Sequence, residues 1–95
     1  MHYFGSELFY RLDEPTRDFL MKTSFLPRMT VGMAQDLTGH QSANRILSNL
    51  HRNNFFIHKH FQAEPWYEYH PLFREFLLNL IEALLNLIIR MITGA

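Results

Sequence analysis

The chain has 95 residues, the size of one compact domain, and an apolar fraction of 47% with 15% aromatic residues excludes intrinsic disorder. Nine Lys and Arg residues balance nine Asp and Glu residues, so the formal net charge is zero. The domain as a whole therefore offers no general attraction to a phosphate backbone, which argues against a free-standing DNA-binding protein.

Two helices are predicted at the start of the chain. Residues 3–12 place Phe4, Leu8, Phe9 and Leu12 three and four positions apart, on one helical face. Residues 13–15 (Asp-Glu-Pro) then combine an N-cap candidate, an acidic first-turn residue and a proline, which favours a second helix. The core face of this second helix is predicted to carry Phe19, Leu20 and Phe25.

A short third helix and an amphipathic fourth helix form a candidate helix-turn-helix pair. Residues 26–29 interrupt the pattern, Thr30 can cap the third helix, and Gly39 can end it. The third helix contains the apolar residues Val31, Met33, Ala34 and Leu37. In the fourth helix, residues 42–53, we expect Ile46, Leu47 and Leu50 to face inward and Arg45, Asn49 and Arg52 to face outward.

A β-hairpin is predicted next. Residues 55–61 are rich in β-forming side chains, residues 62–65 end in a proline that can turn the chain, and residues 66–70 form a returning strand. Two strands after a helix-turn-helix pair make a wing. The predicted fold class is therefore mainly α with a small β-hairpin, a winged helix followed by a long C-terminal helix.

The last segment, from Leu72 onward, is predicted as the longest helix. Its polar residues form one narrow stripe: Glu75, Asn79, Glu82, Asn86 and Arg90. These interruptions leave no run of about 18 apolar residues, so we expect no membrane span. We assign residues 1–78 to the winged-helix domain and residues 79–95 to an apolar extension. The excess apolar face requires a neighbour, either a following helical repeat or a second copy in a homodimer.

Four strings, in the same order, resemble the winged-helix domains of MalT-like regulators in the LuxR family, which are signal-transduction ATPases of the STAND class. Residues 14–24 read EPTRDFLMKTS and residues 36–39 read DLTG. Residues 46–56 read ILSNLHRNNFF, and residues 66–77 read WYEYHPLFREFL. The resemblance covers residues 3–78 and weakens beyond them. It implies a piece of a larger regulator whose parent chain supplies an ATPase core and a sensor domain as partners.

The resemblance also implies a role for His70. In STAND proteins the winged-helix domain folds back on the ATPase core at rest, and a histidine at the end of the wing reaches the β-phosphate of bound ADP. That position is His70 here, within Tyr69-His70-Pro71, whereas plant relatives have methionine and aspartate as its neighbours. The residues alone leave another interpretation open, because a histidine at a strand-to-helix junction often caps the helix.

The chain is not expected to act as an enzyme or to bind a cofactor alone. It contains no glycine-rich phosphate loop with its lysine, so ADP or ATP would be held by the rest of the full-length protein. His58 and His60, joined by His51 or His70, do not make a metal site without cysteines or an acidic cluster, and we expect none. The aromatic residues Trp66, Tyr67, Tyr69 and Phe73 are expected to be core rather than a base-stacking surface.

Two functions follow from these features. The preferred one is a regulatory interaction module that packs on its ATPase core and senses ADP. The alternative is a stand-alone winged-helix transcription factor that reads DNA with Arg45, His51 and Arg52, which the zero net charge disfavours. The absence of cysteine and of a basic, then apolar, N-terminal leader leads us to expect a cytoplasmic protein.

Overall fold

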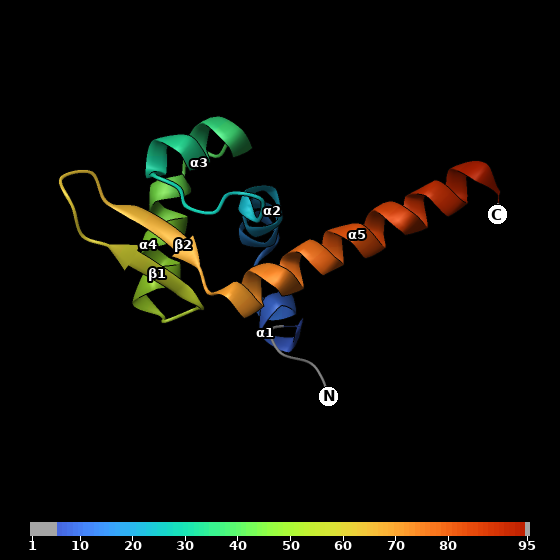
Figure 1. The fold of residues 1–95 in the computed structure, drawn as a ribbon, viewed down its shortest axis with the longest axis horizontal. Helices are drawn as coiled ribbons and strands as arrows, with labels where there is room; N and C mark the ends of the chain where they lie inside the picture. Colours follow the sequence, from blue (N-terminus) through green and yellow to red (C-terminus); the bar gives the residue numbers. More distant parts are fainter. Residues whose placement is uncertain (1–5, 95) are drawn as a thin grey trace.

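A computed structural model describes residues 6–94, and within them the elements follow the predicted order of four helices, a hairpin and a long helix (Figure 1). The mainly α winged-helix class predicted from the sequence is confirmed. The elements are α1 (Ser6–Arg11), α2 (Glu14–Thr23), α3 (Val31–Thr38), α4 (Ala43–Arg52), β1 (Ile57–His60), β2 (Trp66–Tyr69) and α5 (Pro71–Thr93).

Local capping fixes the helix boundaries where the sequence predicted them. The Asp13 carboxylate accepts hydrogen bonds from the Thr16 amide and hydroxyl at the start of α2. The Thr30 hydroxyl accepts from the Met33 amide at 3.2 Å at the start of α3. Gly39 ends α3 with a φ of 76°, a left-handed conformation that glycine adopts without a steric penalty.

The wing is a two-stranded antiparallel sheet in which Ile57 pairs with Tyr69 and Lys59 pairs with Tyr67. A third segment extends it, because Met29 and Tyr67 exchange two backbone hydrogen bonds of 2.8 and 2.7 Å. The segment before α3, which the sequence indicated only as a break between helices, therefore attaches the helix-turn-helix pair to the wing.

One apolar core joins the helices, the inner face of the wing and the first turns of α5. Phe19 and Leu20 of α2 and Phe73 and Leu77 of α5 are fully buried in it. The three inward positions predicted for α4 are confirmed as buried. The remaining members of the core are Phe9, Met29, Ala34, Ala43, Ile46, Leu47, Leu50, Tyr67 and Tyr69.

One predicted core position is wrong, and two apolar residues of α3 are exposed. Phe25 lies beyond the end of α2 and is 58% exposed, because the chain has already turned away from the helical path. Met33 and Leu37 lie one turn apart on the outer side of α3 and are 45% and 51% exposed, so Ala34 provides the buried contact. Phe4 lies outside the described residues, as does the side chain of Leu8.

Two strand and helix boundaries also differ from the predicted ones. β1 begins at Ile57 rather than at residue 55, because Phe56 has a φ of 57° and cannot continue an extended strand. α5 begins one residue before Leu72, at Pro71, whose fixed φ suits the first turn of a helix. The distal part of α5 runs away from the rest of the domain (Figure 1). Leu77 is the last buried residue of α5, and the domain boundary at residue 78 stays a prediction.

Candidate functional site

His70 lies at the junction between β2 and α5 and is held there by its backbone. Its amide donates to the Phe56 carbonyl at 2.7 Å, and its carbonyl accepts from the Arg74 amide at 2.9 Å. The side chain is exposed, and Nδ1 accepts a hydrogen bond from the Leu72 amide at 3.1 Å. His70 is therefore the N-cap of α5, the capping role that the sequence had left open.

The cap determines which ring nitrogen of His70 carries a proton. Because Nδ1 accepts from the Leu72 amide, it has no proton of its own, and the proton of the neutral ring is on Nε2. An exposed Nε2–H at the exit of the wing is a hydrogen-bond donor. The position is also the N-terminal end of a 23-residue helix, where the helix dipole favours negative charge.

A shallow pocket of about 440 Å³ opens beside His70. One side is formed by the turn that precedes β1, and the other side by the end of β2. His58 and Glu68 are also among the residues that line it. The lining residues are Asn54, Phe56, Ile57, His58, Glu68, Tyr69, His70 and Pro71.

A buried hydrogen bond holds the strand that leads to His70. The Tyr69 hydroxyl and the Thr23 hydroxyl are 2.6 Å apart, and Thr23 donates to the Phe19 carbonyl at 2.8 Å. Because the single Thr23 proton is used in that bond, Tyr69 donates to Thr23. Burial raises the pKa of the Tyr69 phenol above its usual value, since a phenolate there would lose its solvation. β2 is thus fixed to α2 one residue before His70.

Arg74 holds the other side of His70. Its Nε donates to the Ser24 carbonyl at 2.9 Å, and its terminal nitrogen donates to the Phe25 carbonyl at 3.3 Å. These carbonyls follow the end of α2, so the guanidinium satisfies backbone acceptors that have no partner in the helix. Arg74 therefore ties the first turn of α5 to α2. Arg74 stands within the string of residues 66–77, but no local pattern predicts this role, since its partners are about 50 positions away in the sequence.

Comparison with known proteins identifies the domain. The family model described as the MalT winged helix domain matches residues 5–85. The chain belongs to the MalT winged-helix family. The HTH-type transcriptional regulator MalT of Yersinia pestis (strain Pestoides F) is 33% identical over 75 residues, which are 79% of this chain and 8% of that protein. The MalT regulator of Klebsiella pneumoniae subsp. pneumoniae is 32% identical over 75 residues, which are again 79% of this chain and 8% of that protein. No solved structure matches the chain.

The MalT winged-helix domain described here spans about 8% of the length of these curated relatives. The match extends to residue 85, so it includes the wing, His70 and the first half of α5. It supports the resemblance drawn from the four sequence strings. The relatives are transcriptional regulators, and this chain corresponds to one regulatory module of such a regulator.

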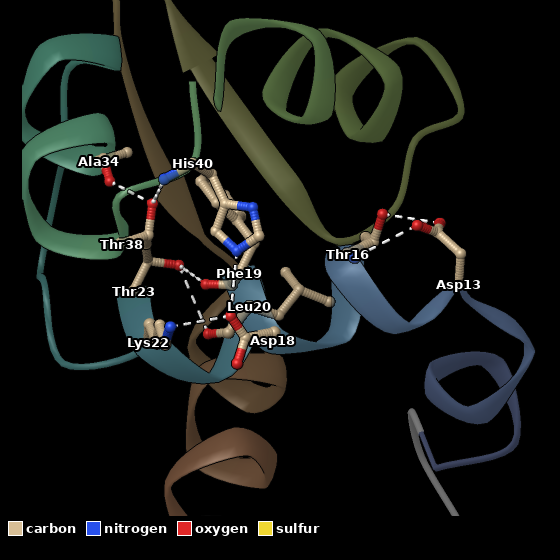
Figure 2. A network of polar contacts seen from close by, with 10 residues as sticks. All are labelled: Asp13, Thr16, Asp18, Phe19, Leu20, Lys22, Thr23, Ala34, Thr38 and His40. Atoms are coloured by element: carbon tan, nitrogen blue, oxygen red, sulfur yellow. Dashed lines mark hydrogen bonds and ion pairs between the residues drawn. The ribbon is translucent and has the colours of Figure 1, made fainter. Parts of the chain in front are cut away.

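A polar network, which the sequence did not reveal, joins α2 of the winged-helix domain to the turn between α3 and α4 (Figure 2). The Asp18 carboxylate lies 3.0 Å from His40 Nε2 and 3.0 Å from Lys22 Nζ. The hydrogen bonds with His40 and Lys22 lower the pKa of the Asp18 carboxyl below its usual value. The His40 amide in turn donates to the Thr38 hydroxyl, which donates to the Ala34 carbonyl. The network fixes the helix-turn-helix pair on α2.

The hairpin histidines share one face of the wing, as predicted from their spacing. The ring centroids of His58 and His60 are 4.5 Å apart, and His60 Nε2 lies 2.6 Å from a Glu68 oxygen. Trp66 was expected in the core with the neighbouring aromatic residues, but it lies half-buried and stacks on His60 at 3.5 Å, with the Arg28 guanidinium 4.8 Å from its ring. Within residues 6–94, no group of three or more His, Cys, Asp or Glu side chains is placed to hold a metal ion.

The basic residues of α4 lie on its exposed side, as predicted. Arg52 donates to the Asn49 side chain at 3.0 Å. The hydrogen bond from Thr16, with a smaller contribution from the charge of Arg45, lowers the pKa of the Asp13 carboxyl. DNA binding by this helix stays the alternative prediction.

Proposed function

We propose that this domain is the regulatory winged-helix module of a MalT-type, ATP-dependent transcriptional regulator. It packs on the ATPase core of its own parent chain in the resting state and contacts the ADP held there. The observation that carries this proposal is the state of His70: its ring is exposed at the wing exit, and its Nδ1 is occupied by the cap. Membership of the MalT winged-helix family supports it.

The chemistry proposed for His70 is one hydrogen bond from Nε2–H to a β-phosphate oxygen. The ring donates while neutral, because a second proton on Nδ1 would remove the acceptor that caps α5. A phosphate at this place also lies near the positive end of the α5 dipole. Such a contact to a charged acceptor contributes about 1.5–3 kcal/mol.

The contact makes ADP a latch between two domains. It exists only in the closed state, in which the winged-helix domain is folded back on the ATPase core. ADP therefore binds the closed state more tightly than the open state and stabilises it by that difference in affinity. Exchange for ATP at the core then releases the domain. In this scheme the domain has no enzymatic activity of its own, ADP and ATP are held by the rest of the regulator, and the protein acts in the cytoplasm, where transcription is controlled.

The test compares two replacements of His70 in the intact regulator. His70→Ser keeps an N-cap oxygen for the Leu72 amide but removes the Nε2–H group that is proposed to donate to the phosphate. His70→Gln keeps an amide nitrogen at about the distance of Nε2 but caps poorly. We expect bound ADP to dissociate at least about tenfold faster from the serine variant than from the wild type, with higher basal transcription, and the glutamine variant to stay near the wild type.

The two variants separate the latch from the helix cap. If the histidine only capped α5, the serine variant would retain ADP as the wild type does, and the glutamine variant would be the one that loses stability. That pattern, with unchanged basal activity in the serine variant, contradicts the proposed contact with ADP.

A further inference from the structure

The two faces of β2 differ, and its outer face leads to His70. The two tyrosines of β2 are buried in the core, so the alternation along a strand turns Trp66 and Glu68 to the outside of the wing. His70 follows two residues after Glu68, is exposed and begins α5 (Figure 1). Glu68 is therefore the outward-facing residue of β2 that lies next to His70.

Glu68 and His70 line the same shallow pocket of about 440 Å³. They are two residues apart on an extended chain, which places their Cα atoms about 6.6 Å from each other. This separation is shorter than the Debye length of about 8 Å at physiological ionic strength, so the charge of Glu68 acts at His70. Among residues 6–94, those that line the pocket include a carboxylate but no lysine and no arginine.

The carboxylate of Glu68 is held in place by its neighbours on the wing. One of its oxygens lies 2.6 Å from Nε2 of His60, on the paired strand β1. The ring of His60 stacks on Trp66, and the Arg28 guanidinium lies over the same indole, two residues farther from His70 along β2. When the His60 ring is neutral, its Nε2–H donates this bond and the negative charge stays on Glu68.

A phosphate group at His70 meets both attraction and repulsion. The Nε2–H donor and the N-terminal end of α5 favour one phosphate group. The carboxylate of Glu68 opposes each further negative charge, and no lysine or arginine among the described lining residues offsets it. ATP carries one phosphate more than ADP, bonded directly to the β-phosphate. ATP therefore brings more negative charge close to Glu68 and gains no cationic partner from this pocket.

We propose that Glu68 makes the closed state selective for ADP over ATP. This inference rests on the proposed contact between His70 and the β-phosphate, and it gives that contact its nucleotide specificity. Glu68 acts through its charge and is a specificity-determining residue, not a ligand of the phosphate. When ATP replaces ADP at the core, repulsion from Glu68 destabilises the closed state and the domain is released.

The test compares nucleotide binding by the intact regulator and three variants. Glu68→Gln removes the charge but keeps an oxygen that can accept from Nε2–H of His60. Glu68→Asp keeps the charge. Glu64→Gln removes the same charge from an exposed residue between the two strands, outside the pocket. Titration calorimetry of the resting regulator at about pH 8, where imidazole side chains are neutral, gives the Kd of ADP and of a non-hydrolysable ATP analogue.

The measured quantity is the ratio of the Kd of the ATP analogue to the Kd of ADP. We expect this ratio to fall about three- to tenfold in Glu68→Gln, because that is the effect of one unit charge at this separation near a protein surface. The ratio should stay near the wild-type value in Glu68→Asp and Glu64→Gln. The difference between the wild type and Glu68→Gln should shrink at about 1 M salt, where screening is strong, whereas a purely structural role of Glu68 would leave the ratio unchanged.

Two results would overturn the role of Glu68: an unchanged ratio in Glu68→Gln, or an equal fall in Glu64→Gln. His70→Ser separates this inference from the proposed function. If His70→Ser loses ADP faster while Glu68→Gln keeps the wild-type ratio, the specificity role alone is wrong. If His70→Ser retains ADP as the wild type does, the contact with ADP is wrong and the role of Glu68 is lost with it. Circular dichroism of the 95-residue chain checks that each variant is folded.

Discussion

At the scale of single residues, the two ring nitrogens of His70 have separate roles. Nδ1 accepts from the Leu72 amide and begins α5, while Nε2 is left as an exposed donor. The backbone of the same residue is bonded to Phe56 and Arg74, so His70 is held by the turn before β1 and by the first turn of α5. The capping and phosphate-binding interpretations of this histidine are therefore compatible, because each uses a different nitrogen.

The charge of Asp18 gives a pH-dependent contribution to stability. Its pKa is lowered in the folded state by the hydrogen bonds with His40 and Lys22, so this stability is present above the unfolded pKa near 4. It is lost as the pH falls through the lowered folded value. Because the Asp18 side chain is 45% exposed, solvent screening limits the contribution to about 0.5–1 kcal/mol.

Urea unfolding at several pH values measures this contribution. At pH 7 the wild type should be more stable than Asp18→Asn by about 0.5–1 kcal/mol. The difference should shrink as the pH falls below about 4 and through the lowered pKa of the folded state. A difference that stays constant down to pH 2 would show that the carboxylate charge does not hold His40.

At the scale of elements, the sequence predicts what depends on near neighbours. The caps at Asp13 and Thr30 and the stop at Gly39 act within a few residues, so the helix boundaries could be predicted from the sequence. The pairing of Met29 with Tyr67 joins segments 38 positions apart, and no local pattern reveals it.

Exposure and the polar contacts of the site were harder to predict for the same reason. Periodicity finds an apolar face, but it does not say that Ala34 rather than Met33 provides the buried contact of α3. His70 was identified as a candidate through a family resemblance. The sequence left two interpretations open, a helix cap and a contact with a phosphate. Arg74, which holds the first turn of α5, and the Asp18–His40 pair, which holds the helix-turn-helix pair on α2, depend on backbone carbonyls and loops brought together only by the fold.

The Tyr69–Thr23 hydrogen bond is the energetic link between β2 and α2. Tyr69→Phe removes the donor from a fully buried site, and we expect a loss of about 1 kcal/mol in the free energy of unfolding. Thr23→Val should also destabilise the domain, since it removes the bond to the Phe19 carbonyl as well. In a double-mutant cycle the two changes should couple by about 1 kcal/mol. Simple additivity would show that the 2.6 Å contact does not stabilise the wing.

At the scale of the whole molecule, the domain presents two separate surfaces. The wing exit with His70 is proposed to face the ATPase core of the parent chain, and the distal half of α5 exposes apolar side chains. The two surfaces lie apart, because His70 is at the N-terminal end of α5 and the exposed apolar side chains are toward its C-terminal end (Figure 1). The buried first turns of α5 connect them, because Phe73 and Leu77 hold the helix in the core.

The most direct test of the ADP contact is the structure of the intact regulator with ADP bound. The proposal predicts that Nε2 of His70 lies about 2.7–3.2 Å from a β-phosphate oxygen while Nδ1 still accepts from the Leu72 amide. A wing exit turned away from the nucleotide, with Nε2 more than about 6 Å from every phosphate oxygen, would contradict it.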